Sequence, residues 1–446
     1  MKKLISLTVA LLMLGSSTMF AQQKVWTLEE CVRYAIDNNI TIKQQMIQTE
    51  MQKNTLELSK LKLLPTLNAQ LSHDYTFGRA LNYLSYKYVD HNALNDNAYI
   101  GGSMTLFNGL VNYNTIKRNQ VQVLASEQDL QNIKDNISLN IALAYLQILL
   151  NKELVIANST QLQTTKQQIE KTRKMVDAGS VARGNLLQIE AQAAQEEVQL
   201  INMQNQLDIS YLNLAQMLEL KSPEGFEIIM PAISVDTASS VSGKVDEIFN
   251  VAVKNRPEIK SAELKLQSSA YDLKIARGGR SPRLTSSHSM GTRYGYVFHD
   301  TANISFQDQI KNYKNYGVGF SLTIPILNGW QVNKNIANSK LQMESSEYSL
   351  EAEKKNLYKS IQQAYADAVA SLKKYVSSTK AVASSEESFR YTEQKFNVGM
   401  VTPVDYNTAK TTLLKAQSDL AQSKYEFIFK TKVLDFYKGL PLNLNK

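Results

Sequence analysis

The chain of 446 residues carries one pattern of landmarks twice. Residues of the first half recur 217 positions later, and beyond residue 108 they recur 220 positions later. The matching pairs include Ala35 with Ala252, Asn38 with Asn255, Pro65 with Pro282, Asn108-Gly109 with Asn328-Gly329, and Gly179 with Gly399. Offsets held over so many positions indicate an internal duplication. We divide the chain into repeats 22–218 and 244–438, a connector 219–243 rich in Pro, Gly and Ser, and a tail 439–446.

Each repeat is predicted to contain two very long helices, at 110–177 and 185–218 and again at 331–397 and 402–438. Residues 111–177 contain no Gly or Pro, and the whole chain has only 18 Gly and 8 Pro. Apolar residues recur every seven positions, for example Ile116, Val123, Leu130, Ile137 and Ala144, which is typical of coiled-coil packing. Gly179 and Gly399 would end the longer helices. Each repeat therefore predicts an antiparallel helical hairpin roughly 100 Å long with a glycine at its tip.

Shorter helices are predicted before the long ones. Thr27 and Glu30 form a capping-box pattern at the start of a helix 27–38, and a second helix 40–63 stops before Pro65. The second repeat predicts the same pair at 246–255 and 257–276, with Pro257 at the first helical position. We interpret Cys31 as a buried apolar position of the first helix.

Four segments alternate between apolar and small or polar residues. Residues 316–326 do so most strictly, with Tyr316, Val318 and Phe320 on one face and Gly317, Gly319 and Ser321 on the other. Their repeat partner is 97–107, and the other two segments are 67–77 and about 283–294. A run of about eleven residues matches a transmembrane β-strand, although a half-buried soluble sheet is the alternative for such a pattern alone.

Four strands are too few to close a barrel, and an open sheet edge is not tolerated in lipid. Several copies of the chain would therefore have to pool their strands. Two copies supply eight strands around a filled interior, whereas three supply twelve strands around an interior wide enough to conduct. Three copies would also supply twelve long helices, enough to form a helical tube.

The first 21 residues have the pattern of a secretory signal peptide. Lys2 and Lys3 precede an apolar stretch, and Ala21 follows small residues as the expected cleavage position. No Cys lies at that position, so we expect no lipid anchor. Removing the two lysines lowers the formal charge from +8 to +6. Lys and Glu alternate along the helices, which does not favour nucleic-acid binding.

The sequence offers little for catalysis or metal binding. It has one Cys and four His, and no two His are four residues apart. His73 and His288 lie on strand faces, and His91 and His299 lie in expected loops. Gly278-Gly279 follows a helix and is interpreted as its end. We expect no enzyme, no cofactor and no metal site.

In its duplicated order, the chain resembles the TolC family of outer-membrane efflux and secretion channels. The similar segments are the strand–helix junctions Leu106-Phe107-Asn108-Gly109 and Pro325-Ile326-Leu327-Asn328-Gly329, the Leu64-Pro65 junction, and the tips Asp177-Ala178-Gly179-Ser180-Val181 and Asn397-Val398-Gly399-Met400-Val401. The resemblance covers essentially the whole mature chain. It implies a mainly α homotrimer, in which a twelve-stranded β-barrel in the outer membrane continues into a twelve-helix tunnel through the periplasm of a Gram-negative bacterium.

The resemblance also implies partners and site residues. The partners are outer-membrane lipid, a periplasmic adaptor (membrane fusion) protein, and an inner-membrane RND or ABC transporter. The adaptor would contact the tips at Ala178, Gly179, Ser180, Val398, Gly399 and Met400. Asp405 matches a tunnel-mouth carboxylate of the family. Thr408 stands where the family often has a second Asp, and Asn185 is the equivalent position in the first repeat. Phe396 and Val401 replace a gating tyrosine and arginine.

Asp405 has a second interpretation that is compatible with the first. Thr402 is a suitable N-cap and Pro403 a suitable first helical residue, so Asp405 would stabilise the start of a helix. For the whole protein, two functions remain open. One is a passive conduit for multidrug efflux or type I secretion; the other is a coiled-coil envelope scaffold that spans the periplasm without conducting.

Overall fold

The structure is a computed structural model that describes residues 25–82, 86–231, 243–300 and 302–440. The expected signal peptide, part of the connector and most of the tail lie outside these residues. The chain is mainly helical and divides into two compact units. The helical unit comprises residues up to Gln44, Gln131–Arg256 and the chain from Lys355 onward, and the sheet unit comprises Gln45–Leu130 and Pro257–Lys354. Each unit therefore combines segments of both sequence repeats.

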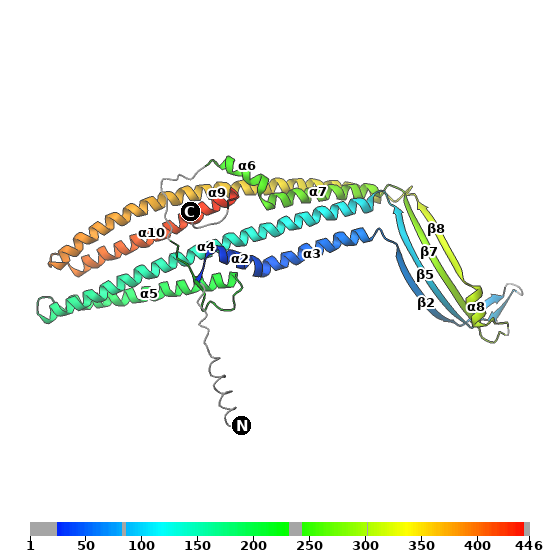
Figure 1. Cartoon of the computed structure of the whole chain (residues 1–446), viewed down its shortest axis with the longest axis horizontal. Helices are drawn as coiled ribbons and strands as arrows, with labels where there is room; N and C mark the ends of the chain where they lie inside the picture. The colour runs from blue at the N-terminus through cyan, green and yellow to red at the C-terminus, as the bar shows by residue number, and fades with distance from the viewer. Residues whose placement is uncertain (1–24, 83–85, 232–242, 301, 441–446) are drawn as a thin grey trace, which may run out of the picture. The chain divides into compact units, whose positions relative to one another are not determined.

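Two helical hairpins dominate the helical unit (Figure 1). The first consists of α4 (Val111–Asp177) and α5 (Arg183–Met217), and the second of α9 (Gln331–Asn397) and α10 (Pro403–Tyr437). Helices α4 and α9 begin in the sheet unit and continue into the helical unit. All eight ends lie within two residues of those expected from the heptads and the tip glycines.

The short helices also occur where the caps predicted them. They are α2 (Leu28–Asn38) and α3 (Ile40–Leu61) in the first repeat, and α6 (Val245–Asn255) and α7 (Pro257–Gly278) in the second. The capping box of α2 is confirmed: the Glu30 amide donates to the Thr27 hydroxyl over 3.1 Å, and the Thr27 amide donates to the Glu30 carboxylate over 3.0 Å. Helix α7 ends at Gly278, two residues beyond the expected end at 276.

The main apolar core lies in the helical unit, where α2 packs between α4, α5 and α10. Cys31 is fully buried there, as expected, and burial raises the pKa of its thiol to about 12. Tyr145 of α4 donates to the carbonyls of Trp26 and Ile229, over 3.2 and 2.7 Å. These carbonyls flank a small parallel pairing of β1 (Val25–Trp26) with β6 (Glu227–Ile228), which ties the connector to the N-terminal segment. Among the described helices, α4 alone contains a stretch apolar and long enough to cross a membrane, a test that core helices of soluble proteins also pass.

The sheet unit contains a four-stranded antiparallel sheet in the order β2-β5-β7-β8. The strands are β2 (Thr66–Thr76), β5 (Ala93–Phe107), β7 (Arg283–Val297) and β8 (Asn315–Thr323). The predicted strand 316–326 is too long, because β8 ends at Thr323, two residues before Pro325. Pro325 has no amide hydrogen to donate to a neighbouring strand. Two further elements had no clear signal in the sequence: a hairpin of β3 (Arg79–Asn82) with β4 (Lys87–Asp90), and the short helix α8 (Phe306–Asn312).

Candidate functional site

The two hairpin tips have the same backbone geometry. At the first tip the Gly179 amide donates to Val176 and the Ser180 amide donates to Met175, over 2.9 and 3.0 Å. At the second, Gly399 and Met400 make the equivalent bonds to Phe396 and Lys395 over 3.0 and 2.9 Å. The two glycines have φ angles of +70° and +76°, a region that favours glycine at helix ends.

The tips are open to solvent. No heavy atom lies within 4 Å of a Cβ built on Gly179 or Gly399. The side chains of Val398 and Met400 are 69% and 76% exposed. Exposed apolar side chains of this kind are available to a partner protein.

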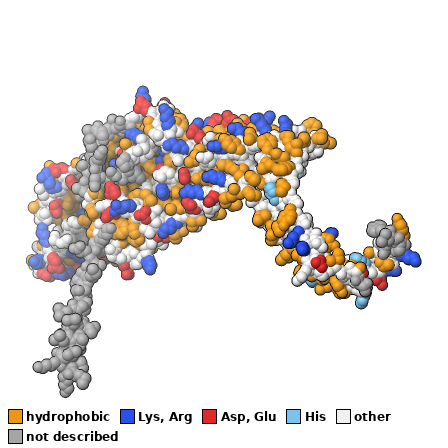
Figure 2. Space-filling view, turned by 45° about the vertical axis from the view of Figure 1, so that its right-hand side comes forward, with side chains coloured by type: hydrophobic (Ala, Val, Ile, Leu, Met, Phe, Trp, Pro, Cys, Tyr) orange, Lys and Arg blue, Asp and Glu red, His pale blue; other side chains and the backbone are white. Residues whose placement is uncertain are grey.

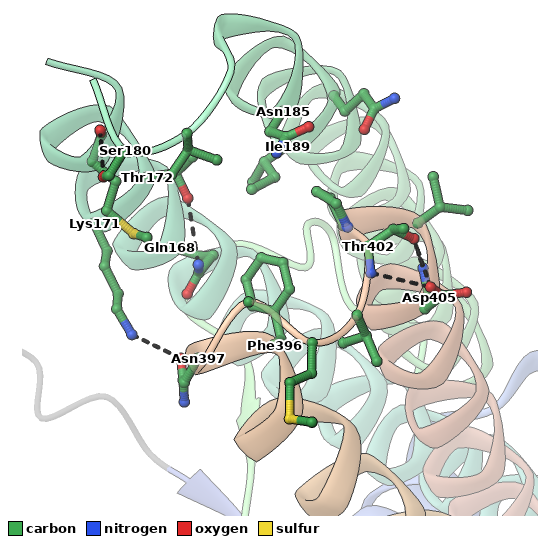
Figure 3. A pocket seen from close by; sticks show the side chains of 18 residues that line it. Gln168, Lys171, Thr172, Ser180, Asn185, Ile189, Phe396, Asn397, Thr402 and Asp405 are labelled. Atoms are coloured by element: carbon green, nitrogen blue, oxygen red, sulfur yellow. Dashed lines mark hydrogen bonds between the residues drawn. The ribbon is translucent and has the colours of Figure 1, made fainter. Parts of the chain in front are cut away.

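A cavity of about 720 Å³ lies between the two hairpins next to the tips (Figure 3). Of the residues expected at the tunnel mouth and the tips, it brings together Ser180, Asn185, Gly399, Met400 and Asp405. Thr408 lies apart from it, in a groove with Gln188 and Gln192. The cavity thus groups some of the residues that the resemblance selected and leaves Ala178, Gly179, Val398 and Thr408 outside its lining.

Asp405 closes a capping box at the start of α10 (Figure 3). The Thr402 amide donates to its carboxylate over 3.1 Å and the Thr402 hydroxyl donates over 2.6 Å, while the Asp405 amide donates to that hydroxyl over 3.2 Å. The bonds from the Thr402 hydroxyl and amide hold the pKa of Asp405 below its ordinary value. The equivalent helix α5 has Ala182 at its N-cap and no side-chain cap.

Phe396 and Val401, which the resemblance places at a gate, both line the cavity. The Phe396 ring stacks on Tyr406 of the same hairpin with centroids 4.6 Å apart. The hairpins are bridged at this level by Lys171, whose ammonium donates to the Asn397 side chain over 2.7 Å. At this level the cavity is therefore lined by an apolar stack and one exposed hydrogen bond between the hairpins.

A buried polar network between the hairpins was missed by the sequence analysis. Lys410 of α10 and Glu196 of α5 are 4% and 7% exposed and lie 3.7 Å apart. Thr165 of α4 donates to the Glu196 carboxylate and accepts from Lys410, which also donates to the Gln161 carbonyl over 3.2 Å. Burial lowers the pKa of Lys410. The sequence signal was that Lys410 lies one helical turn after Tyr406, which begins the seven-residue apolar repeat Tyr406, Leu413, Leu420, Phe427 and Leu434.

The four-stranded sheet has one apolar and one polar face. In the strand register, one row across the sheet, on the apolar face, consists of Leu67, Gly102, His288 and Val318. The next row, on the polar face, consists of Thr66, Ser103, Ser287 and Gly319. On the apolar face the side chains of Leu71, Tyr316 and Phe320 are 83%, 73% and 70% exposed. Apolar side chains exposed to this extent match the lipid-facing surface of a membrane strand.

The remaining ionisable groups form no metal-binding cluster within the described residues. His73 contacts Asp96 across β2 and β5 at 2.5 Å, and His288 lies within β7. Figure 2 shows Lys and Arg side chains interspersed with Asp and Glu over the helices, as expected from the sequence.

Comparison with known proteins agrees with this arrangement. A profile of the outer membrane efflux protein family matches residues 32–219 and 248–428. Outer membrane protein TolC of Escherichia coli K12 is 23% identical, over 96% of this chain and 84% of TolC, and proteases secretion protein PrtF of Dickeya chrysanthemi is 20% identical, over 96% and 90%. The CusC crystal structure superposes with a TM-score of 0.78 at 15% identity, over 93% of this chain and 92% of CusC. The chain therefore belongs to the outer membrane efflux protein family, whose members are outer-membrane transport channels and not enzymes.

Proposed function

We propose that three copies of this chain form an outer-membrane channel that conducts substrates passively from a periplasmic adaptor and an inner-membrane pump to the exterior. The strands of the three copies close a twelve-stranded barrel, and their long helices close a twelve-helix tunnel. The process served is multidrug efflux or type I secretion.

The observation that carries this proposal is the two-faced sheet with β2 and β8 at its ends. An apolar face of exposed Leu, Tyr and Phe is suited to lipid, and the opposite face of Ser, Thr, Asn and Gly is suited to water. In lipid the free edges of β2 and β8 must be paired. Pairing β8 of one copy with β2 of the next satisfies both edges and places the polar face inside.

The exposed tips support an adaptor site. Ala178, Gly179 and Ser180 of the first hairpin and Val398, Gly399 and Met400 of the second would make the contact. TolC-like relatives include a protein named for protease secretion, which supports an ABC-type partner, whereas the family description names efflux, which supports an RND-type partner.

Asp405 would supply a ring of three carboxylates at the periplasmic mouth, where such a ring attracts cations. The capping bonds from Thr402 keep this carboxylate ionised and fixed in place. Asn185, which lines the same cavity, and Thr408, in the neighbouring groove, add no charge, so the ring would be single.

Two measurements test the proposal. Mass determination of the purified mature protein in detergent should give a trimer, and a monomer or dimer as the sole folded species would contradict it. Trimers reconstituted in a planar bilayer should conduct. Stable trimers without conductance would favour the periplasm-spanning scaffold instead.

A further inference from the structure

We propose that Arg283 forms a ring of positive charge inside the barrel that makes this part of the channel favour anions and the anionic groups of substrates. The inference rests on the proposed function, since the ring requires three copies around a water-filled interior. It concerns the fixed charge of the barrel, which is separate from that of the hairpin tips.

The strand register places Arg283 on the polar face. Arg283 pairs with Thr323 of β8, two residues from the pair Thr285 and Ser321. Side chains two residues apart on a strand lie on one face. The pairing therefore aligns Arg283 with the Ser, Thr and Gly rows that face the interior of the barrel.

Only three side chains on this polar face are charged in the described strands: Asp74, Arg283 and Arg293. Arg293 lies ten residues further along β7, about 33 Å away. The row next to it on that face contains Asn95 and Gly295 and reaches Asp74 on β2. At that end of the barrel a negative ring would thus partly offset a positive one, whereas the Arg283 ring has no acidic counterpart.

The environments of the two arginines differ as well. Arg293 lies over the ring of Tyr313, with its guanidinium carbon 4.9 Å from the ring centroid. Arg283 is exposed and has no ion-pair partner among the described residues. An unpaired guanidinium facing water is free to act on passing ions. We therefore expect the larger influence on ion selectivity from Arg283.

The test is the ratio of chloride to potassium permeability, taken from the reversal potential of trimers in a bilayer with a KCl gradient around 0.1 M. Arg283→Gln should lower this ratio roughly two- to three-fold, since a change of about half a kT in local potential shifts the chloride and potassium concentrations by about 1.6-fold each in opposite directions. Arg293→Gln should lower it less, and Asp74→Asn should raise it. The matched control Arg283→Lys, which keeps the charge, should leave it unchanged. The differences should shrink at 1 M salt, where the Debye length falls to about 3 Å.

The outcomes separate this inference from the proposed function. Conducting Arg283→Gln trimers with the wild-type permeability ratio would overturn the charged ring and leave the channel intact. Wild-type trimers that insert but do not conduct would overturn the channel and the ring together. If Arg283→Gln does not assemble, the Asp74→Asn and Arg293→Gln variants decide. A chloride-to-potassium permeability ratio equal to that of the wild type in both variants would overturn the charged interior.

Discussion

The two hairpin tips share one backbone turn but begin their return helices differently. Gly179 and Gly399 end α4 and α9 with the same pair of hydrogen bonds and nearly the same φ angle. The second return helix then starts with Thr402 and Asp405 in a capping box, and the first starts with Ala182 and no side-chain cap. The duplication thus kept the geometry of the turn while the side chains after it diverged.

The divergence continues further into the two return helices. Glu190 of α5 and Lys410 of α10 are equivalent in the duplication. Glu190 pairs with Arg173 of its own hairpin at 3.2 Å, and both side chains are well exposed. Lys410 instead reaches into the other hairpin and is almost fully buried with Glu196. One position therefore holds a surface ion pair in the first repeat and joins the two hairpins in the second.

The largest effect is expected from bulky substitutions at the tips, which test whether both tips contact the same partner. Gly399→Trp and Gly179→Trp should each abolish drug resistance or secretion in cells, because a bulky side chain would block the docking surface. Trimer yield should stay near that of the wild type, since the sites are open and left-handed backbone costs a non-glycine residue only about 1–2 kcal/mol.

Gly225→Trp is the matched control for the tips. Gly225 has a φ angle of +75° and no atom within 4 Å of a built Cβ, but it lies in the connector. The Gly225→Trp variant should keep the transport activity of the wild type. Loss of the trimer in the tip variants would show instead that the tips are structural.

The second effect concerns the buried pair. Lys410→Ala should destabilise the protein by about 3–5 kcal/mol, because it leaves the Glu196 carboxylate buried without its cationic partner. The exposed equivalent, Glu190→Ala, should cost less than about 1 kcal/mol. Denaturant titration of the helical circular dichroism signal in detergent measures both. Similar midpoints for the two variants would mean that Lys410 and Glu196 are not buried together in the assembled protein.

The third effect concerns the helix starts. Thr402→Ala should weaken the start of α10 by about 1 kcal/mol because the Asp405 amide loses its acceptor. Ala182→Ser should strengthen the start of α5 by a similar amount. Amide hydrogen exchange in the first turns of α5 and α10 should move in opposite directions in the two variants. An unchanged exchange rate at α10 would indicate that the Thr402 cap does not form in solution.

The smallest effect is expected from Asp405→Asn, which should weaken block by a trivalent cation added from the periplasmic side without loss of the trimer. Because Thr402 holds the pKa of Asp405 low, wild-type block should persist as pH falls and disappear only below the usual aspartate range near pH 4. Block that already weakens above pH 4 would show that repulsion within the ring outweighs the Thr402 bonds. Equal blocking constants for wild type and Asp405→Asn would show that Asp405 does not line the mouth.

Much of the fold could be predicted because its determinants are local. Heptads, tip glycines and caps act within a few residues of one another, so the ends of α4, α5, α9 and α10 followed from the sequence. Strand alternation likewise predicted the two faces of β8. The β3–β4 hairpin and α8 were missed because their short segments carry little periodicity.

The duplication, the helical hairpins, the two-faced strands and the capping role of Asp405 all followed from the order of residues along the chain. The contact of Lys410 with Glu196 and Thr165, residues 214 and 245 positions away, did not, because side chains on three helices meet only when two hairpins pack together. The register that aligns Arg283 with the polar rows of its neighbours likewise emerged only from the folded sheet. Pairing between distant strands depends on contacts that no local pattern encodes, and a shift of one residue would reverse every side chain.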